Sequence, residues 1–469
     1  MTGLFGSLNT STSGLRAQQA ALQTTSHNLA NANTIGYSRQ RVTMEANVPL
    51  SYAGIGQIGT GALINGITRV TDDFVTMQLQ NEQASLNRFQ QESDIIGQLE
   101  AVYNEPSTTG VAHQLSELFV SWGNLSSNPE STTSKTMVLR QSETFLDTVN
   151  HASNKMTGLA GETVSLIQKE ILDFNEAAKQ LKTVNDQIFN ATVKGEMPND
   201  LLDKQDQLIG QMKSIAGVKV DTTDKYGRQF VSLGETDIVS ENEIKTLEMS
   251  ETEPGVITVD GEDHEITTGS IKGLQDGRKV VLEKQTELNT FMDDFAKAVN
   301  IIQTGGNAED NTVFFVLKDG QYEVNEVLLS DPSSLVTGKD FNNTISGDGS
   351  RAKAIADLQN TTLSSDFSVE DYNEEKMSFN SDPAGSTLFN RYNDIVTDMG
   401  ITKQQADNMV ANQTDLTALL EQRQASISGV DLNEEVVNMI QYQSAFQANS
   451  RVISTIAEML DTLINRTGV

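Results

Sequence analysis

The amino-acid sequence predicts a mainly α-helical protein with a β insertion: terminal helices that form coiled coils, an elongated helical bundle and a small inserted β domain. Three observations lead to this fold class. Apolar residues recur at helical spacing near both ends, the same period fills several long internal segments, and it changes to strand-like runs over 217–270. The apolar fraction of 37% and the aromatic fraction of 6% are low for a globular chain, so we expect long, narrow packing surfaces.

The first 38 residues are rich in Ser, Thr, Asn and Gln, yet leucines recur there every seven residues. They are Leu8, Leu15, Leu22 and Leu29. This spacing puts one apolar stripe on a helix that has no acidic residue. The positions between the leucines include Ser11, Gln18 and Thr25, and a lone helix with so polar a seam is marginal in water. The N-terminal helix therefore needs a partner.

The last segment of the chain has a matching period. Alternating steps of four and three from 432 to 464 meet apolar residues at eight of ten positions: Leu432, Val436, Met439, Phe446, Ile453, Ala457, Leu460 and Ile464. Such a pattern is typical of a coiled-coil helix. A core helix inside its own domain is the alternative that periodicity leaves open. We expect segments 1–44 and 425–469 to form one inner coiled-coil layer.

The middle of the chain also contains long helical segments. We expect them at 71–103, 130–193, 274–302 and 385–427. Together, 45–216 and 271–424 are predicted to form an elongated helical bundle. Val313–Leu317 followed by Lys318-Asp319-Gly320 predicts a β-hairpin near 312–325. Two stretches rich in Gly, Ser, Asn and Pro, 44–66 and 329–350, are interpreted as extended or loop connections.

Residues 217–270 have a strand-like pattern. The runs are Val218–Asp221, Phe230–Leu233 and Val256–Ile266, and Asp260-Gly261 falls where a tight hairpin turn is expected. Acidic residues outnumber basic ones here by 13 to 4. The segment therefore reads as a small, acidic outer β domain that is inserted in the bundle.

Composition excludes several classes of function. The 469 residues carry a net charge of −31 and no cysteine, which argues against binding to nucleic acid or anionic lipid and excludes thiolate chemistry. No cleavable signal is visible in residues 1–30. The longest apolar run, Val313–Leu317, is far short of the ~18 residues of a membrane span, so no membrane insertion is expected. The first 44 residues contain no acidic residue, and the acidic and basic residues of the last 45 nearly balance. The net charge therefore resides in 45–424.

No group of residues points to catalysis. His27, His113, His151 and His264 lie at least 38 residues apart, whereas metal sites bring ligands at short spacing. Adjacent acids on a helix point about 100° apart and do not share a site. Gly54–Gly59 matches the dinucleotide pattern G-x-G-x-x-G, but no helix is expected after it to hold a pyrophosphate. We expect neither an enzyme nor a cofactor or metal ion.

Both ends carry a family resemblance. NLANANTIGYSRQRV, residues 28–42, resembles the signature of the rod, hook and hook-associated axial proteins of the bacterial flagellum. Its Tyr37-Ser38-Arg39-Gln40 continuation most resembles the hook-associated members, as does the segment 429–466. Gly54 to Asp72 fits the family's connection after the N-terminal helix. The resemblance covers about 110 residues, and Ile35 stands where the family often has a proline, so the turn there is less rigidly set.

The resemblance implies a structural subunit that joins the hook to the filament. Such proteins are exported unfolded through the flagellar type III apparatus and add at the distal tip through terminal helices that are disordered in the free monomer. The implied partners are further copies in a ring, the hook protein, a second hook-associated junction protein and an export chaperone on the C-terminal helix. The shared signature adds four positions to the N-terminal assembly surface: Asn31, Asn33, Gly36 and Tyr37.

Two alternatives stay open. Another axial protein, such as the hook subunit, would have similar terminal helices, although the Ser38-Arg39-Gln40 continuation favours a hook-associated protein. An extracellular adhesive module could be carried by the acidic insertion 217–270. That segment contains no ligand-spaced set such as an EF-hand loop, so a solubilising outer domain is the simpler interpretation.

Overall fold

A computed structural model describes residues 2–52, 56–306, 313–341 and 347–466. The described residues are mainly helical with small antiparallel sheets, which confirms the predicted fold class. The chain divides into two compact units. Unit 1 consists of Met1–Arg88, Lys169–Lys272 and Ala411–Val469, and unit 2 of Phe89–Gln168 and Gly273–Val410. None of the described helices has the length and hydropathy needed to cross a membrane.

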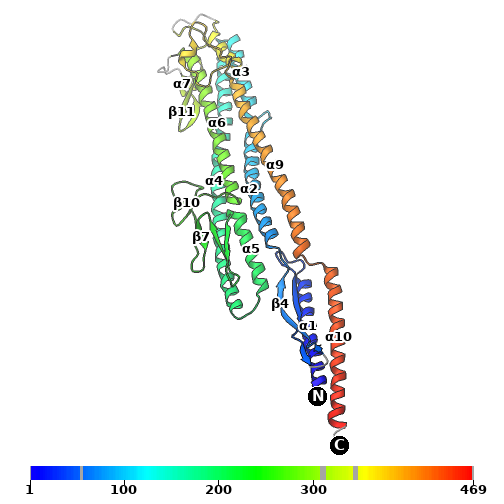
Figure 1. Cartoon of the computed structure of the whole chain (residues 1–469). Coiled ribbons are helices and arrows are strands. Elements are labelled where there is room, and N and C mark those ends of the chain that lie inside the picture. Colours follow the sequence, from blue (N-terminus) through cyan, green and yellow to red (C-terminus); the bar gives the residue numbers. More distant parts are fainter. Residues whose placement is uncertain (1, 53–55, 307–312, 342–346, 467–469) are drawn as a thin grey trace. The chain divides into compact units, whose positions relative to one another are not determined.

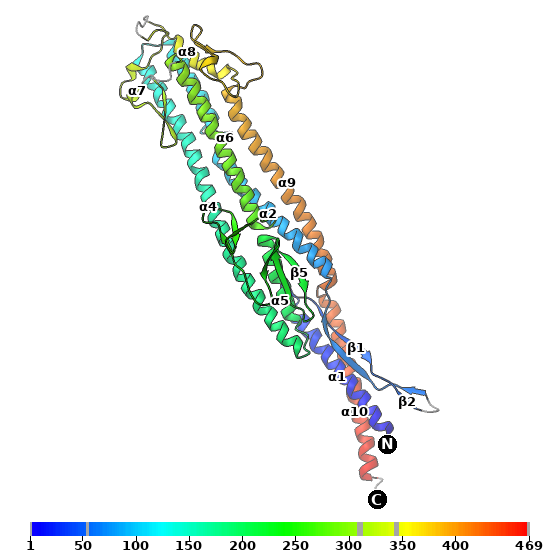
Figure 2. The same cartoon turned by 60° about the vertical axis from the view of Figure 1, so that its left-hand side comes forward.

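Unit 1 contains both terminal helices. Its helices are α1 (Thr2–Asn31), the start of α2 (Asp73–Tyr103), the end of α4 (Thr132–Val193), α5 (Asn199–Ala216), the end of α9 (Leu388–Ser428), α10 (Leu432–Asp461) and the short η4 (Thr462–Arg466). Asp431 caps α10, because its side chain accepts hydrogen bonds from the backbone N–H groups of Asn433 and Glu434. α1 and α10 lie side by side in Figures 1 and 2.

A long hairpin follows α1. β1 (Gln40–Ala46) pairs antiparallel with β4 (Ala62–Arg69), with a bulge at Thr43/Met44, and β2 (Leu50–Tyr52) pairs with β3 (Gly56–Ile58). The stretch interpreted as an extended connection is thus a hairpin. Gly54 and Ile55 of the glycine-rich pattern lie outside the described residues. The remaining part of that pattern is followed by strand β4 and not by a helix.

The insertion 217–270 forms two three-stranded antiparallel sheets. One has the order β5-β6-β7 and the other β10-β9-β8. Their strands are β5 (Lys219–Thr223), β6 (Gln229–Leu233), β7 (Thr236–Val239), β8 (Leu247–Met249), β9 (Ile257–Val259) and β10 (Glu262–His264). Asp260 and Gly261 both have positive φ angles between β9 and β10, as a tight hairpin turn requires.

Polar side chains of α4 hold these sheets in unit 1. The Asn175 amide pairs with both backbone groups of Leu247, and the buried Asn185 amide bonds the backbone of Gln229. By its contacts the insertion is therefore grouped with the terminal helices. The predicted division into terminal layer, bundle and outer domain is based on hydrophobic periodicity in the sequence and not on contacts between residues. It stays a prediction.

Unit 2 is a helical bundle with small irregular additions. It contains the remaining parts of α2, α4 and α9, most of α6 (Ser270–Thr304), and α3 (Val111–Ser127), α7 (Glu326–Ser330) and α8 (Ser350–Asp357). The 3-10 helices are η1 (Pro332–Ser334), η2 (Leu358–Asn360) and η3 (Val369–Asp371), and β13 (Tyr372–Asn373) pairs with β14 (Ser378–Phe379). β11 (Phe315–Lys318) pairs with β12 (Gln321–Val324) in the stretch where the sequence predicts a hairpin.

Aromatic side chains fill the core of unit 2. Phe295 on α6 lies at the centre, with ring centroids 5.1 Å from Phe145 on α4 and 5.5 Å from Phe315 on β11. Trp122 of α3 packs on Phe314 at 5.2 Å. These rings come from helices and from the β11 segment, which are far apart in the sequence, and their burial holds the bundle together.

Candidate assembly interface

The two terminal helices pack antiparallel. Asn28, near the end of α1, hydrogen-bonds Glu435 at the start of α10, whereas a Cβ at Gly14 would lie 3.2 Å from the Asn449 side chain. The buried face of α1 consists of small or polar residues, which are Ser11, Ala17, Ala21, Thr24, Thr25 and Asn28. The helices therefore approach closely at this face, without large interlocking side chains.

The predicted N-terminal positions lie beside this face. Leu8, Leu15, Leu22 and Leu29 are all partly exposed, and so are Asn31 and Tyr37, whereas Asn33 and Gly36 are exposed. The polar seam residues Ser11 and Thr25 are buried instead. In unit 1, α1 packs mainly on α10 and on the β1–β4 hairpin, and its buried face is turned toward them, with the leucines beside it. The single chain therefore leaves the leucine stripe only half covered.

The predicted C-terminal positions are covered still less. Met439, Phe446, Ile453 and Leu460 are partly buried, and Leu432, Val436, Ala457 and Ile464 are exposed. The buried residues of α10 are Glu435 and Ile456. Further apolar side chains are also exposed: Val437, Ile440, Val452 and Met459 on α10 and Leu463 on η4. One chain thus leaves most of the apolar surface of α10 uncovered.

Asn28 joins four segments of unit 1. Its side chain is 1% exposed. Nδ2 donates to the Gln40 carbonyl oxygen at 2.9 Å and to Glu435 Oε2 at 3.1 Å, and Oδ1 accepts from the Tyr37 hydroxyl at 2.7 Å and the Gln40 N–H at 3.0 Å. Two donors and two acceptors are thus all paired. One amide thereby connects α1, the following turn, β1 and α10.

Tyr37 is the aromatic part of this junction. Its ring meets His27 edge-on, with centroids 5.5 Å apart. Burial, and then the carboxylates of Asp200, Asp203 and Glu435, raise the pKa of the Tyr37 hydroxyl well above its ordinary value. The hydroxyl therefore keeps its proton and remains a donor to Asn28.

Carboxylates of α5 hold the base of the hairpin. Asp203 accepts the Ser38 N–H at 3.0 Å, and Arg69 Nη1 lies 2.8 Å from Asp203 Oδ1 and 2.7 Å from Asp206 Oδ2. Asp200 accepts from the Gln40 side chain at 2.7 Å. Burial raises the pKa of Asp206, although the Arg69 guanidinium acts in the opposite direction. These contacts join the hairpin to the body of unit 1.

Gly61 brings the far part of the hairpin against α1. The Ala62 N–H donates to Ser13 Oγ at 3.1 Å. Gly61 has a φ of +114°, and a Cβ there would lie 1.9 Å from Ser13 Oγ and 3.2 Å from the Thr10 Cα. Neither the backbone angle nor the available space suits a larger residue.

We expect Gly61→Ala to weaken this docking, because the strained backbone and the contact with Thr10 together cost about 1–3 kcal/mol. The backbone amides of the hairpin should then exchange with deuterium about tenfold faster in the variant than in the wild type, as measured by mass spectrometry. Gly59→Ala is the matched control, since a Cβ there meets nothing within 4 Å. Equal exchange rates in the Gly61 variant and the wild type would contradict this account.

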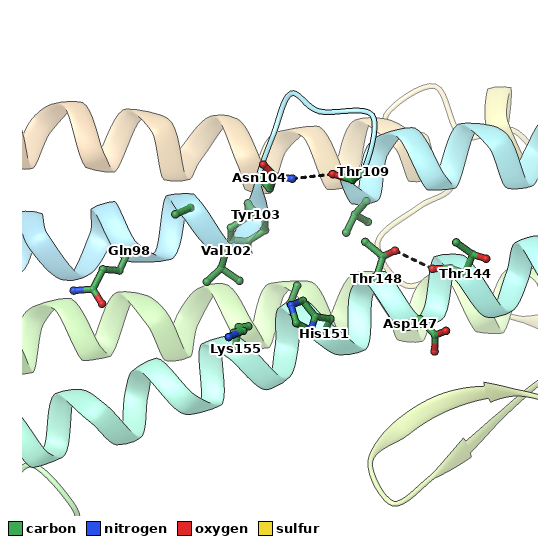
Figure 3. Close-up of a pocket in the computed structure, with 14 residues that line it drawn as sticks. Gln98, Val102, Tyr103, Asn104, Thr109, Thr144, Asp147, Thr148, His151 and Lys155 are labelled. Atoms are coloured by element: carbon green, nitrogen blue, oxygen red, sulfur yellow. Dashed lines mark hydrogen bonds between the residues drawn. The ribbon is translucent and has the colours of Figure 1, made fainter.

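A separate groove lies in unit 2. It has a volume of about 720 Å³, and its lining includes Gln98, Val102, Tyr103, His151 and Lys155 (Figure 3). The Tyr103 hydroxyl already donates to the Lys284 carbonyl oxygen at 3.3 Å. Within the described ranges, no group of three or more His, Asp or Glu residues is placed to hold a metal ion. We find no catalytic arrangement among the described lining residues.

Family comparisons match most of the chain. The model of the "Flagellar hook-associated protein FlgK helical domain" matches residues 96–315. The models "Flagellar basal body rod FlgEFG protein C-terminal" and "Flagella basal body rod protein" match 421–466 and 8–37. These two shorter matches fall on the terminal helices that pair in unit 1.

Full-length relatives have the same kind of name. Flagellar hook-associated protein 1 of Bacillus subtilis (strain 168) is 28% identical, covering 100% of this chain and 99% of the relative. The protein of that name from Escherichia coli (strain K12) is 26% identical over 98% and 99%. The solved structure of the flagellar hook junction protein FlgK from Burkholderia pseudomallei matches with a TM-score of 0.59 and 14% identity, over 75% of this chain and 100% of that chain, which supports the fold.

Proposed function

The chain belongs to the FlgK family of flagellar hook-associated proteins, and from this premise we propose that it is a subunit of the junction between hook and filament. It is a structural protein of the flagellum, outside the cell, and not an enzyme. One observation carries the proposal beyond the family: α10 and the short η4 that follows it leave eight large apolar side chains exposed in the single chain. They are Leu432, Val436, Val437, Ile440, Val452, Met459, Leu463 and Ile464.

Eight uncovered apolar side chains within residues 432–464 support assembly of copies into a ring. Burying one such side chain fully stabilises a contact by about 1.5–3 kcal/mol. The acid-free first 44 residues and the nearly neutral last 45 allow copies to pack without strong charge repulsion. In this proposal 1–44 and 425–469 form the inner layer, and the insertion 217–270 faces outward.

We further propose that the chain is exported unfolded and adds at the distal tip of the hook. Its partners there are the hook protein and a second hook-associated junction protein, and an export chaperone binds the C-terminal helix inside the cell. The small, polar face of α1 supports this, because so little apolar burial holds α1 weakly in one chain. Contacts with neighbours at the tip then supply the missing stabilisation.

The isolated subunit should therefore be monomeric with loose ends. Limited proteolysis is expected to cut within 1–40 and 430–469 well before the helices of unit 2, because those ends bury little apolar surface without neighbours. Mass spectrometry of the fragments measures this. Uniform protection of both ends in solution would contradict the proposed disorder.

Deletion of the gene tests the proposed function. The deletion strain should assemble hooks without filaments and release flagellin monomers, which electron microscopy and analysis of the medium detect. A plasmid copy of the gene is the control and should restore filaments. Loss of the whole hook would indicate a hook subunit instead, and normal filaments in the deletion strain would exclude a junction role.

A further inference from the structure

The outer part of the hairpin is an exposed apolar surface without charge. Residues 46–68 contain no charged side chain, in a chain with a net charge of −31. Val48 is 80% exposed, Leu50 57%, Ile58 49% and Leu63 50%, and Leu50 lies opposite Ile58 in the β2–β3 pair. We call these four residues the hairpin patch. Natural proteins usually protect an exposed strand edge with charged side chains. The absence of charge from the hairpin patch therefore indicates that it is a contact surface.

A second charge-free surface lies on α10. Residues 436–450 contain no charged side chain. Val436, Val437 and Ile440 are exposed there, and we call them the α10 patch. At about 100° per residue, these positions lie on the side of the helix opposite to the one that holds Glu435 and Asn449, which face α1. α1 of the same chain therefore leaves the α10 patch free.

Within one chain the hairpin and α10 approach α1 from different directions. The hairpin bonds Ser13, and Asn449 of α10 lies against the neighbouring Gly14, about 100° around the helix. Figure 2 shows the β2 end of the hairpin pointing away from α1 and α10. The hairpin patch is thus directed away from the terminal helices of its own chain.

We propose that the hairpin patch of one copy packs on the α10 patch of a neighbouring copy. The occupant is a second copy because the two surfaces are complementary: both are apolar and uncharged, so they meet without desolvating a carboxylate. Two different patches of one chain form a head-to-tail contact, which generates rings or helical arrays. This inference rests on the proposed assembly of copies and adds which surfaces touch.

Cross-linking tests the contact directly, since the chain has no cysteine. Leu50→Cys and Ile440→Cys chains, tagged differently, are expressed together in the deletion strain, and isolated flagella are treated with a short bis-maleimide. We expect a cross-linked dimer that carries both tags. Leu50→Cys with Leu166→Cys is the control pair, because Leu166 is also exposed but lies on α4. Incorporation of both variants without the mixed dimer would overturn the inference while leaving the junction role intact.

Charge replacement provides a second readout if the cysteines impair incorporation. Leu50→Lys and Ile440→Glu should each lower incorporation about tenfold or more, because each leaves an unpaired charge in an apolar contact. A chain with both changes places lysine against glutamate at every contact and should recover most of the loss. Circular dichroism monitors folding. Wild-type incorporation of either single variant would overturn the inference.

Discussion

Replacing Asn28 by leucine will prevent incorporation of the chain into flagella while leaving unit 2 folded. The change leaves the Tyr37 hydroxyl, both backbone groups of Gln40 and the Glu435 carboxylate without this partner. Each buried group left unpaired costs about 1–3 kcal/mol, so the ordered arrangement of α1, β1 and α10 loses several kcal/mol. In competition with wild-type chains we expect the variant at about one hundredth of its expressed share, with no change in the thermal unfolding of unit 2.

The matched control for this variant lies on α9, outside the proposed assembly surfaces. Asn412 is exposed, so Asn412→Leu removes the same amide from water-accessible surroundings and should incorporate nearly as the wild type does. Asn28→Asp keeps the shape of the side chain but changes its hydrogen bonding, since it retains the acceptor, loses both donors and puts a carboxylate beside Glu435. This variant should also fail to incorporate into flagella. Normal incorporation of Asn28→Leu would show that this amide is not needed for assembly.

Arg351→Met will lower the melting temperature of unit 2 by about 10 °C. Arg351 is 2% exposed, and its guanidinium donates to the carbonyl oxygens of Ile302, Gln303, Gly338 and Lys339. It also lies 4.2 Å from the centroid of the Phe341 ring. Burial lowers the pKa of Arg351. Losing these bonds leaves buried carbonyls without a donor and costs about 3–5 kcal/mol, and each kcal/mol is worth roughly 2–4 °C in a unit of this size.

Arg140 supplies the comparison for Arg351. Its side chain is 70% exposed and forms an ion pair with Glu143 one turn away, a contact worth about 0–1 kcal/mol. Arg140→Met should therefore shift the melting temperature by less than about 3 °C in differential scanning calorimetry. An equally small shift for Arg351→Met would contradict the structural role assigned to its guanidinium.

Local patterns made much of the fold predictable. The helices α2, α4, α6, α9 and α10 begin and end close to the expected residues, because apolar periods of three and four act within one or two turns. α1 ends at Asn31 and β1 begins at Gln40, so the helix is shorter than the expected segment 1–44. The hairpin turn at Asp260-Gly261 follows from residues that tolerate positive φ. Helices α3 and α5 are absent from the prediction. α3 nevertheless carries a helical signal in the spacing of its buried residues Val111, Leu115, Leu118, Trp122 and Leu125.

The functional surface was less predictable than the elements that form it. Leucine spacing indicates which residues of α1 share a side, yet the side that is buried holds Ser11, Ala21 and Asn28. A period in one helix contains no information about the position of its neighbours. The hairpin and α10 together determine which side of α1 is buried, and they contact α1 from different directions.

The helical class, the matching periods of the two ends and the family resemblance in 28–42 can all be recognised from the amino-acid sequence, because they depend on residue order over short distances. Three features become visible only in the folded chain: which faces of α1 and α10 meet, that Asn28 connects four segments, and that Gly61 contacts α1. These contacts join residues up to 407 positions apart. They arise from packing and from the pairing of buried polar groups, which no local pattern specifies.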